Sequence, residues 1–173
     1  MALGPEGAFD SREVYAGAAL VRVGDELWLY YVGYDRTHGE AHELPRIRND
    51  LDEDTLFAGA ISRAVMRLDG FMSADAPMAG GKLTTPPLVL VGKRLELNMD
   101  ASAGGEVTVE LLGAEGKPIP GYTTEEADAL YYNNVRAVAA WKGETDLSPL
   151  AGRPVRIHFI MRAAKLYAFQ FTG

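Results

Sequence analysis

Alternation of apolar and polar residues with a period of two is the feature that most limits how this chain can fold. Leu95, Leu97 and Met99 alternate with polar side chains, and the same pattern recurs over residues 106–111 and 155–162. A period of two places successive side chains on opposite faces of a strand. These segments, separated by turns rich in Gly, Pro and Asp, predict an all-β chain whose C-terminal part is an antiparallel β-sandwich, of jelly-roll or concanavalin-like type.

The first part of the chain lacks this contrast between faces. Strands are expected over residues 13–22 and 26–33, joined by a tight turn, and over residues 57–68. Apolar side chains occupy both faces of the second strand: Leu27, Leu29 and Tyr31 on one, Trp28, Tyr30 and Val32 on the other. Because such a strand needs neighbours on both faces, we expect a blade-like antiparallel β-meander over residues 1–75, followed by the sandwich over residues 76–173.

Helix is expected in only two short stretches. Thr123 can cap one or two turns over residues 124–130, and Pro149 favours another turn over residues 146–150. Trp141 ends an apolar alternation and is expected in the core. The other strands are expected over residues 71–75, 83–91, 94–99, 106–112, 135–141, 155–162 and 165–171, with Phe169 and Phe171 of the last strand facing the sandwich.

Composition excludes several classes of function. The net charge is −7 and the pI about 5.0, which disfavours binding to a phosphate backbone or to an anionic membrane. The chain has no cysteine, so disulfides, thiolate metal sites and cysteine nucleophiles are absent. No apolar run approaches the ~20 residues that span a bilayer, and the first residues do not resemble a signal peptide. We therefore expect neither nucleic acid nor membrane as a partner.

Two carboxylates are the weak candidates for catalysis. Asp10 precedes the first strand and Asp35 follows the second, so in a meander both belong to loops that open on one side. With Tyr34 and His38 they would line the edge of a sugar cleft, and glycoside hydrolysis needs a pair of carboxyl groups. The alternative is that both aspartates cap turns and pair with a neighbouring arginine.

A second group of candidate ligand-binding residues lies in the C-terminal part. Tyr122, Tyr131 and Tyr132 sit in a polar stretch between strands, with Asp128 close by in the sequence. Aromatic rings are the usual platforms for the C–H face of a sugar. Adjacent Tyr131 and Tyr132 point to opposite sides of an extended chain, so one of them is expected to face solvent.

No metal or other cofactor is expected. His38 and His42 have the spacing of two ligands on a helix, but Gly39 and Pro45 argue against a helix there. Surface acids permit calcium, yet no Asp-x-Asp-x-Asp-Gly loop is present.

Several segments resemble one protein family. They are LGPEGAFDS at residues 3–11, GDELWLYYVGYD at 24–35, RLDGFMS at 67–73, GGKLTTPPL at 80–88 and AKLYAFQF at 164–171. Together they resemble the C-terminal part, the last blade plus the β-sandwich, of five-bladed β-propeller glycoside hydrolases of the invertase and arabinanase type. The resemblance implies that the nucleophile and acid carboxylates belong to earlier blades, so neither is carried over to a position here. It also implies a carbohydrate partner and a secreted or periplasmic parent protein.

Three functions remain open at this stage. The first is a non-catalytic, carbohydrate-associated β-sandwich module of a glycoside hydrolase-like protein, which contacts glycan or supports a propeller. The second is a retaining or inverting glycoside hydrolase that acts within a larger or self-associated assembly, and the third is a structural module without a ligand. The doubly apolar hairpin 13–33 further predicts a homo-oligomer with this hairpin near the interface, unless the hairpin folds back onto the sandwich.

Overall fold

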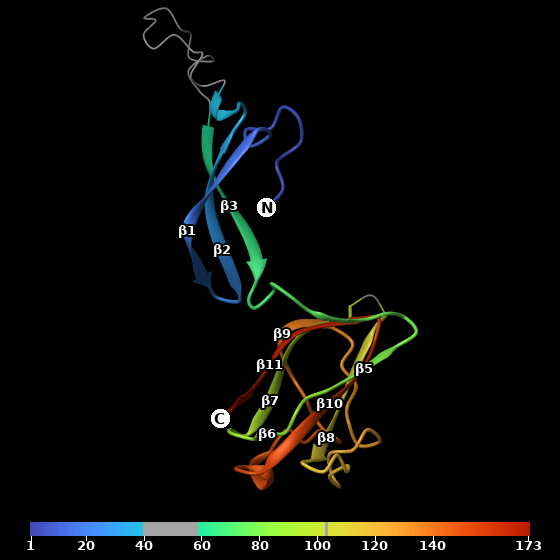
Figure 1. Cartoon of the computed structure of the whole chain (residues 1–173). Coiled ribbons are helices and arrows are strands. Elements are labelled where there is room, and N and C mark those ends of the chain that lie inside the picture. The colour runs from blue at the N-terminus through green and yellow to red at the C-terminus, as the bar shows by residue number, and fades with distance from the viewer. Residues whose placement is uncertain (40–58, 103) are drawn as a thin grey trace, which may run out of the picture. The chain divides into compact units, whose positions relative to one another are not determined.

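The computed structural model describes residues 1–39, 59–102 and 104–173, and the chain is all-β, as the alternation predicts (Figure 1). It divides into two compact units, Met1–Leu68 and Asp69–Gly173. The division lies ahead of the boundary expected between residues 75 and 76, which falls within strand β4 (Ala74–Ala76). That strand pairs with a strand of the second unit and so belongs to it.

The first unit is an antiparallel meander of β1 (Glu13–Val23), β2 (Glu26–Tyr34) and β3 (Gly59–Arg67), in that order across the sheet. A tight turn at Gly24, whose φ is 61°, joins the first two strands, and glycine adopts this left-handed conformation without steric cost. Residues 57 and 58 of the expected third strand lie outside the described residues.

Strand β1 carries an irregularity that shifts its register against β2. The turn pairs Val23 with Glu26, and Leu20 still lies opposite Leu29. Ala16, however, lies opposite Tyr31, so β1 holds two more residues than β2 between these pairs. An insertion of two residues keeps every side chain on its expected face but moves the whole start of β1 along its partner.

The described part of this first unit has no buried hydrophobic side chain; all those that are buried lie at Ala76 or beyond. A three-stranded sheet that buries no apolar side chain is a poor source of stability.

The second unit is a sandwich of two antiparallel sheets. In one, β10 lies between β8 on one side and β5 and β6 on the other; the other has the order β4-β11-β7-β9. The strands are β5 (Gly81–Thr84), β6 (Leu88–Val89), β7 (Arg94–Asp100), β8 (Glu106–Gly113), β9 (Asn133–Val138), β10 (Pro154–Arg162) and β11 (Ala164–Thr172).

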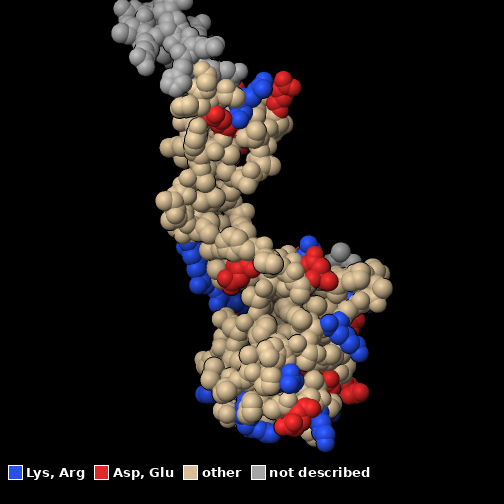
Figure 2. All heavy atoms as spheres, viewed as in Figure 1, with Lys and Arg blue, Asp and Glu red and all other residues tan. Residues whose placement is uncertain are grey.

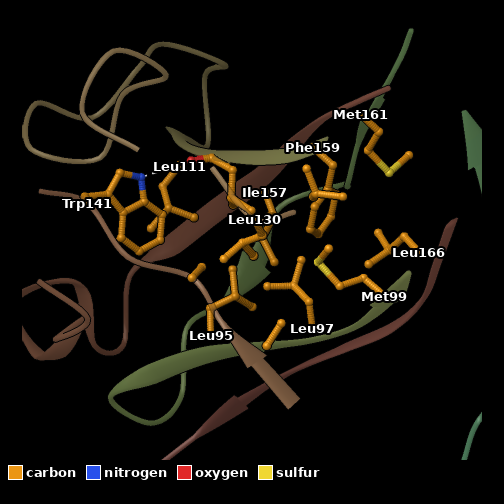
Figure 3. Close-up of a cluster of buried hydrophobic side chains, with 14 of the residues drawn as sticks. Leu95, Leu97, Met99, Leu111, Leu130, Trp141, Ile157, Phe159, Met161 and Leu166 are labelled. Carbon is orange, nitrogen blue, oxygen red and sulfur yellow. Dashed lines mark hydrogen bonds between the residues drawn. The ribbon is translucent and has the colours of Figure 1, made fainter. Parts of the chain in front are cut away.

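The core of the sandwich lies between these sheets and is built from the alternating apolar positions (Figure 3). Leu97 and Met99 of β7 and Ile157 and Phe159 of β10 are fully buried. Trp141 is buried as expected, and its indole Nε1 donates a hydrogen bond to the backbone oxygen of Val109 at 3.0 Å. The indole thus contributes apolar area without leaving its donor unpaired.

A bulge in β11 decides which residues of that strand face the core. Leu166 lies opposite Met99 but Ala168 lies opposite Asn98, so Tyr167 is the extra residue. One extra residue reverses the alternation. Leu166 before the bulge is buried, and after it Phe169 and Phe171 pack against the core, as the sequence predicts.

The expected helix over residues 124–130 is wrong. Thr123 does accept hydrogen bonds from the backbone of Glu126 and Ala127 through its carbonyl oxygen, but the turn ends there. Ala127 then forms a bridge with Trp141 and Leu130 with Val107, so pairing with the sandwich prevails over local helix propensity. The second expected turn is a short 3-10 helix, Ser148–Leu150. No helix in the described residues is long and apolar enough to cross a membrane.

The sandwich is expected to fold without the first unit, because its buried side chains all come from residues 76–166. A fragment spanning residues 69–173 should show dispersed amide resonances and a single cooperative unfolding transition in urea. A broad, non-cooperative transition, or collapsed amide dispersion, would mean that the first unit supplies part of the core.

Candidate functional site

A pocket of about 380 Å³ opens at one end of the three-stranded sheet, where β1 begins and β2 ends. Glu13 lies opposite Tyr34 in the ladder, and Tyr15 follows Glu13 on the same face. The two tyrosine rings meet edge to face, with centroids 5.8 Å apart and an interplanar angle of 85°. The lining residues are Glu13, Tyr15, Tyr34, Arg36, Thr37 and His38.

Glu13 organises the polar groups of this pocket. The Tyr15 hydroxyl donates to Oε2 of Glu13 at 3.0 Å, and the backbone N–H of His38 donates to Oε1 at 2.7 Å. The hydrogen bond to Glu13, followed by burial, raises the pKa of Tyr15, because ionisation would place a phenolate beside a carboxylate. Tyr15 therefore keeps its proton, and the carboxylate holds it in place.

Arg36 adds a cation to the same rim. Its Nε donates to Oδ1 of Asp35 at 3.0 Å, in an ion pair whose side chains are 22% and 43% exposed. Asp35 is thus paired with its neighbouring arginine, as the alternative reading of the sequence expects. A guanidinium carries five N–H donors, so this bond leaves it further donor capacity.

The other candidate carboxylate, Asp10, lies on the opposite face of the sheet. The Tyr31 hydroxyl donates to Oδ2 of Asp10 at 2.8 Å. Tyr31 and Tyr34 are three residues apart in β2, so their side chains lie on opposite faces of the sheet. This hydrogen bond is the main cause that raises the pKa of Tyr31. Asp10 is not among the residues that line the pocket, so the structure brings together Tyr34 and His38 but not Asp10.

The tyrosines expected in the C-terminal part fall into two groups. Tyr122 packs edge-on against Trp141, with ring centroids 5.3 Å apart, and burial raises its pKa. Asp128 accepts the backbone N–H of Gly143 at 2.8 Å and so holds a turn. Tyr131 and Tyr132 are 60% and 44% exposed. Both, not only one, are accessible to a ligand.

A second cavity, of about 500 Å³, involves residues that the sequence does not single out. It lies in the sandwich near the start of β5 and β8 and the end of β10. Arg162 pairs there with Glu106 at 3.6 Å. None of the described residues that line it is aromatic: they are Ala79, Gly80, Gly81, Lys82, Glu106, Ile160, Met161 and Arg162.

In the described part of the chain, no three His, Asp or Glu side chains gather as a metal site requires. His42, the possible partner of His38, lies outside the described residues.

No family model, no curated protein and no solved structure matches this chain. The resemblance to propeller glycoside hydrolases therefore stays a prediction that rests on the sequence segments alone.

Proposed function

We propose that this chain is a non-catalytic, carbohydrate-contacting module of a glycoside hydrolase-like protein and that a saccharide binds in the Tyr15–Tyr34 pocket. The observation that carries the proposal is the convergence of two aromatic rings, a carboxylate and a guanidinium around one cavity. Its volume of about 380 Å³ falls in the range of ~300–1,000 Å³ that is usual for small-molecule sites.

The chemistry of the lining groups suits a polyhydroxylated ligand. A ring face packs on the C–H face of a sugar, which supplies apolar contact without a charge. Each sugar hydroxyl both donates and accepts, and the pocket offers both partners: the Glu13 carboxylate as acceptor and the Arg36 guanidinium as donor. Glu13 is already held by two hydrogen bonds, so it is pre-organised for this role.

The arrangement of carboxylates supports contact with a sugar more than hydrolysis. Hydrolysis by the common route needs two carboxyl groups about 5–10 Å apart on either side of the scissile bond. Of the described residues that line the pocket, Glu13 is the one carboxylic acid. Asp35 is paired with Arg36, and Asp10 is bonded to Tyr31 on the opposite face of the sheet.

The test is a binding screen of the full chain against neutral and acidic oligosaccharides, followed by calorimetry on each hit. Tyr15→Ala should weaken binding at least tenfold, which equals about 1.4 kcal/mol, because it removes a ring from the pocket wall. Tyr15→Phe keeps the ring and should bind within about threefold of the wild type. Tyr131→Ala is the matched control, an exposed tyrosine of the other unit.

Two results would contradict the proposal. Binding that is lost in Tyr131→Ala or Tyr132→Ala but kept in Tyr15→Ala would move the sugar site to the sandwich. Turnover of aryl glycosides that disappears in Asp10→Asn or Asp35→Asn would favour the hydrolase instead.

A further inference from the structure

The register of the three-stranded sheet divides its side chains between two faces that differ in how they are covered. The Tyr31 face carries Ala16, Leu20, Leu27, Leu29, Tyr31, Ala64 and Met66. The Ile61 face carries Tyr15, Val21, Val23, Trp28, Tyr30, Val32, Ile61 and Val65. Strand β2 is apolar on both faces in the sequence, so which face is covered depends on the structure.

The residues that precede β1 cover part of the Tyr31 face. The Phe9 ring stacks on Tyr31 with centroids 6.1 Å apart, and Asp10 accepts the Tyr31 hydroxyl. The two segments approach so closely that a Cβ at Gly33 would lie 2.7 Å from Cε2 of Phe9 and would clash with Asp10. Gly33 is accordingly the one buried residue among those described in Met1–Leu68.

Within the described residues of Met1–Leu68, no segment covers the Ile61 face in this way. Ile61 is 77% exposed, Val65 49%, Tyr30 45% and Val21 45%. The guanidinium of Arg63 lies 3.7 Å from the centroid of the Trp28 ring and shields that side chain in part. Figure 2 shows one side of this unit, on which charged side chains are concentrated toward the ends. A contiguous apolar patch of about 300–600 Å² is the size of the largest patch on a typical protein surface, and such a patch is often functional.

We propose that a second copy of this chain covers the Ile61 face and that the chain forms a homodimer through it. Charge is the first argument for this partner. The face carries Glu13, Glu26, Arg63 and Arg67, two acids and two bases that cancel. The chain as a whole has a net charge of −7, so this neutral face is a surface on which two copies meet without net repulsion.

The size of the face is the second argument and sets the strength of the dimer. From residue 61 to residue 67 the strand spans roughly 20 Å, and three strands span roughly 14 Å, so the projected face is on the order of 300 Å² per copy. That is small beside the ~800 Å² per partner of a standard interface. We therefore expect a weak, concentration-dependent dimer with a Kd on the order of tens of micromolar, at the low end of specific association.

The pocket described above lies at the Glu13–Tyr34 end of this face and shares Tyr15 with it, whereas Val21 and Val65 lie toward the other end. Dimerisation does not depend on the proposed saccharide, and its test is carried out without sugar. Failure of one proposal thus leaves the other standing.

The experiment is sedimentation equilibrium of the full chain from 2 to 200 μM. The wild type should shift with concentration from the 18.7 kDa monomer toward the dimer. Ile61→Asp should raise the Kd at least tenfold, and Val65→Asp should do the same from a second position. Leu20→Asp is the matched control: it adds the same charge to the Tyr31 face, at a side chain that is 43% exposed, and should leave the Kd within about threefold of the wild type.

Folding of each variant is checked by hydrogen exchange of the β2 amides, since β2 is bonded to a strand on each side. The absence of cysteine provides an independent readout, because the thiol of an Ile61→Cys variant is then the only one. This thiol should react with maleimide several-fold more slowly at a protein concentration of 200 μM than at 2 μM. The thiol of Leu20→Cys should react at the same rate at both concentrations.

Any of three results would overturn the proposal. A wild type that stays at the monomer mass at 200 μM would show that a second copy does not cover this face. An unchanged mass in both Ile61→Asp and Val65→Asp, with β2 protection retained, would place the dimer contact elsewhere. A dimer that dissociates in Leu20→Asp but not in Ile61→Asp or Val65→Asp would assign the dimer contact to the Tyr31 face.

Discussion

Replacing Phe159 with Ala is expected to lower the free energy of unfolding of the sandwich by about 3–5 kcal/mol. Phe159 is fully buried in β10, between β5 and β8, and its ring lies 5.5 Å from that of Phe169 in the other sheet. The truncation thus removes a contact that joins the two layers and leaves a cavity between them. The total free energy of unfolding of a domain is about 5–15 kcal/mol. The urea concentration at the midpoint of unfolding should therefore fall by a large amount.

Tyr131→Ala is the control for this measurement. It also removes an aromatic ring, but from a side chain that is 60% exposed, and surface changes of this kind stay within about 0.5 kcal/mol. If Phe159→Ala costs less than about 1 kcal/mol, the two sheets do not pack against each other through this residue.

Ending the chain after Lys165 is expected to prevent the sandwich from folding. The deletion removes most of β11, which lies between β4 and β7 in its sheet, and with it Phe169 and Phe171. It also removes Leu166, which is buried, whereas the two phenylalanines are partly buried and pack against the core. Losing a large buried apolar side chain costs about 2–5 kcal/mol, and β4 loses its paired strand while β7 loses one of two. The truncated chain should show narrow amide dispersion and no cooperative thermal transition.

Deleting residues 1–3 at the other end is the matched control and should leave the melting temperature of the sandwich unchanged. Those residues belong to the first unit and form no part of the buried core. A chain truncated after Lys165 that stays monomeric and melts like the wild type would contradict the placement of β11.

The pocket was accessible to sequence reasoning only in part. Tyr34 and His38 follow from their place at the end of a strand and the start of a loop, and the structure brings both to one cavity. The position of Glu13 in the pocket could not be predicted, because a regular ladder from the turn at Gly24 would place Arg36 opposite it. The two extra residues in β1 bring Glu13 opposite Tyr34 instead. No local sequence pattern predicts such an irregularity.

Local propensity also misleads where long-range pairing competes with it. Residues 124–130 have a cap and good helix formers, yet Ala127 and Leu130 form bridges with Trp141 and Val107. The helical interactions of a seven-residue stretch are marginal. Two bridges to a packed sandwich outweigh them, and nothing within the stretch itself shows that such partners exist.

The sequence by itself determined the all-β class, most strand positions and which faces of the sandwich strands are buried. It did so because a period of two converts directly into alternating faces, whatever the partner strand is. Only the tertiary structure decided the rest: the register of β1, the sheet order, and which apolar face of the first unit the Phe9–Asp10 segment covers. These depend on contacts between residues far apart in the chain, and for a strand that is apolar on both sides, alternation carries no information about them.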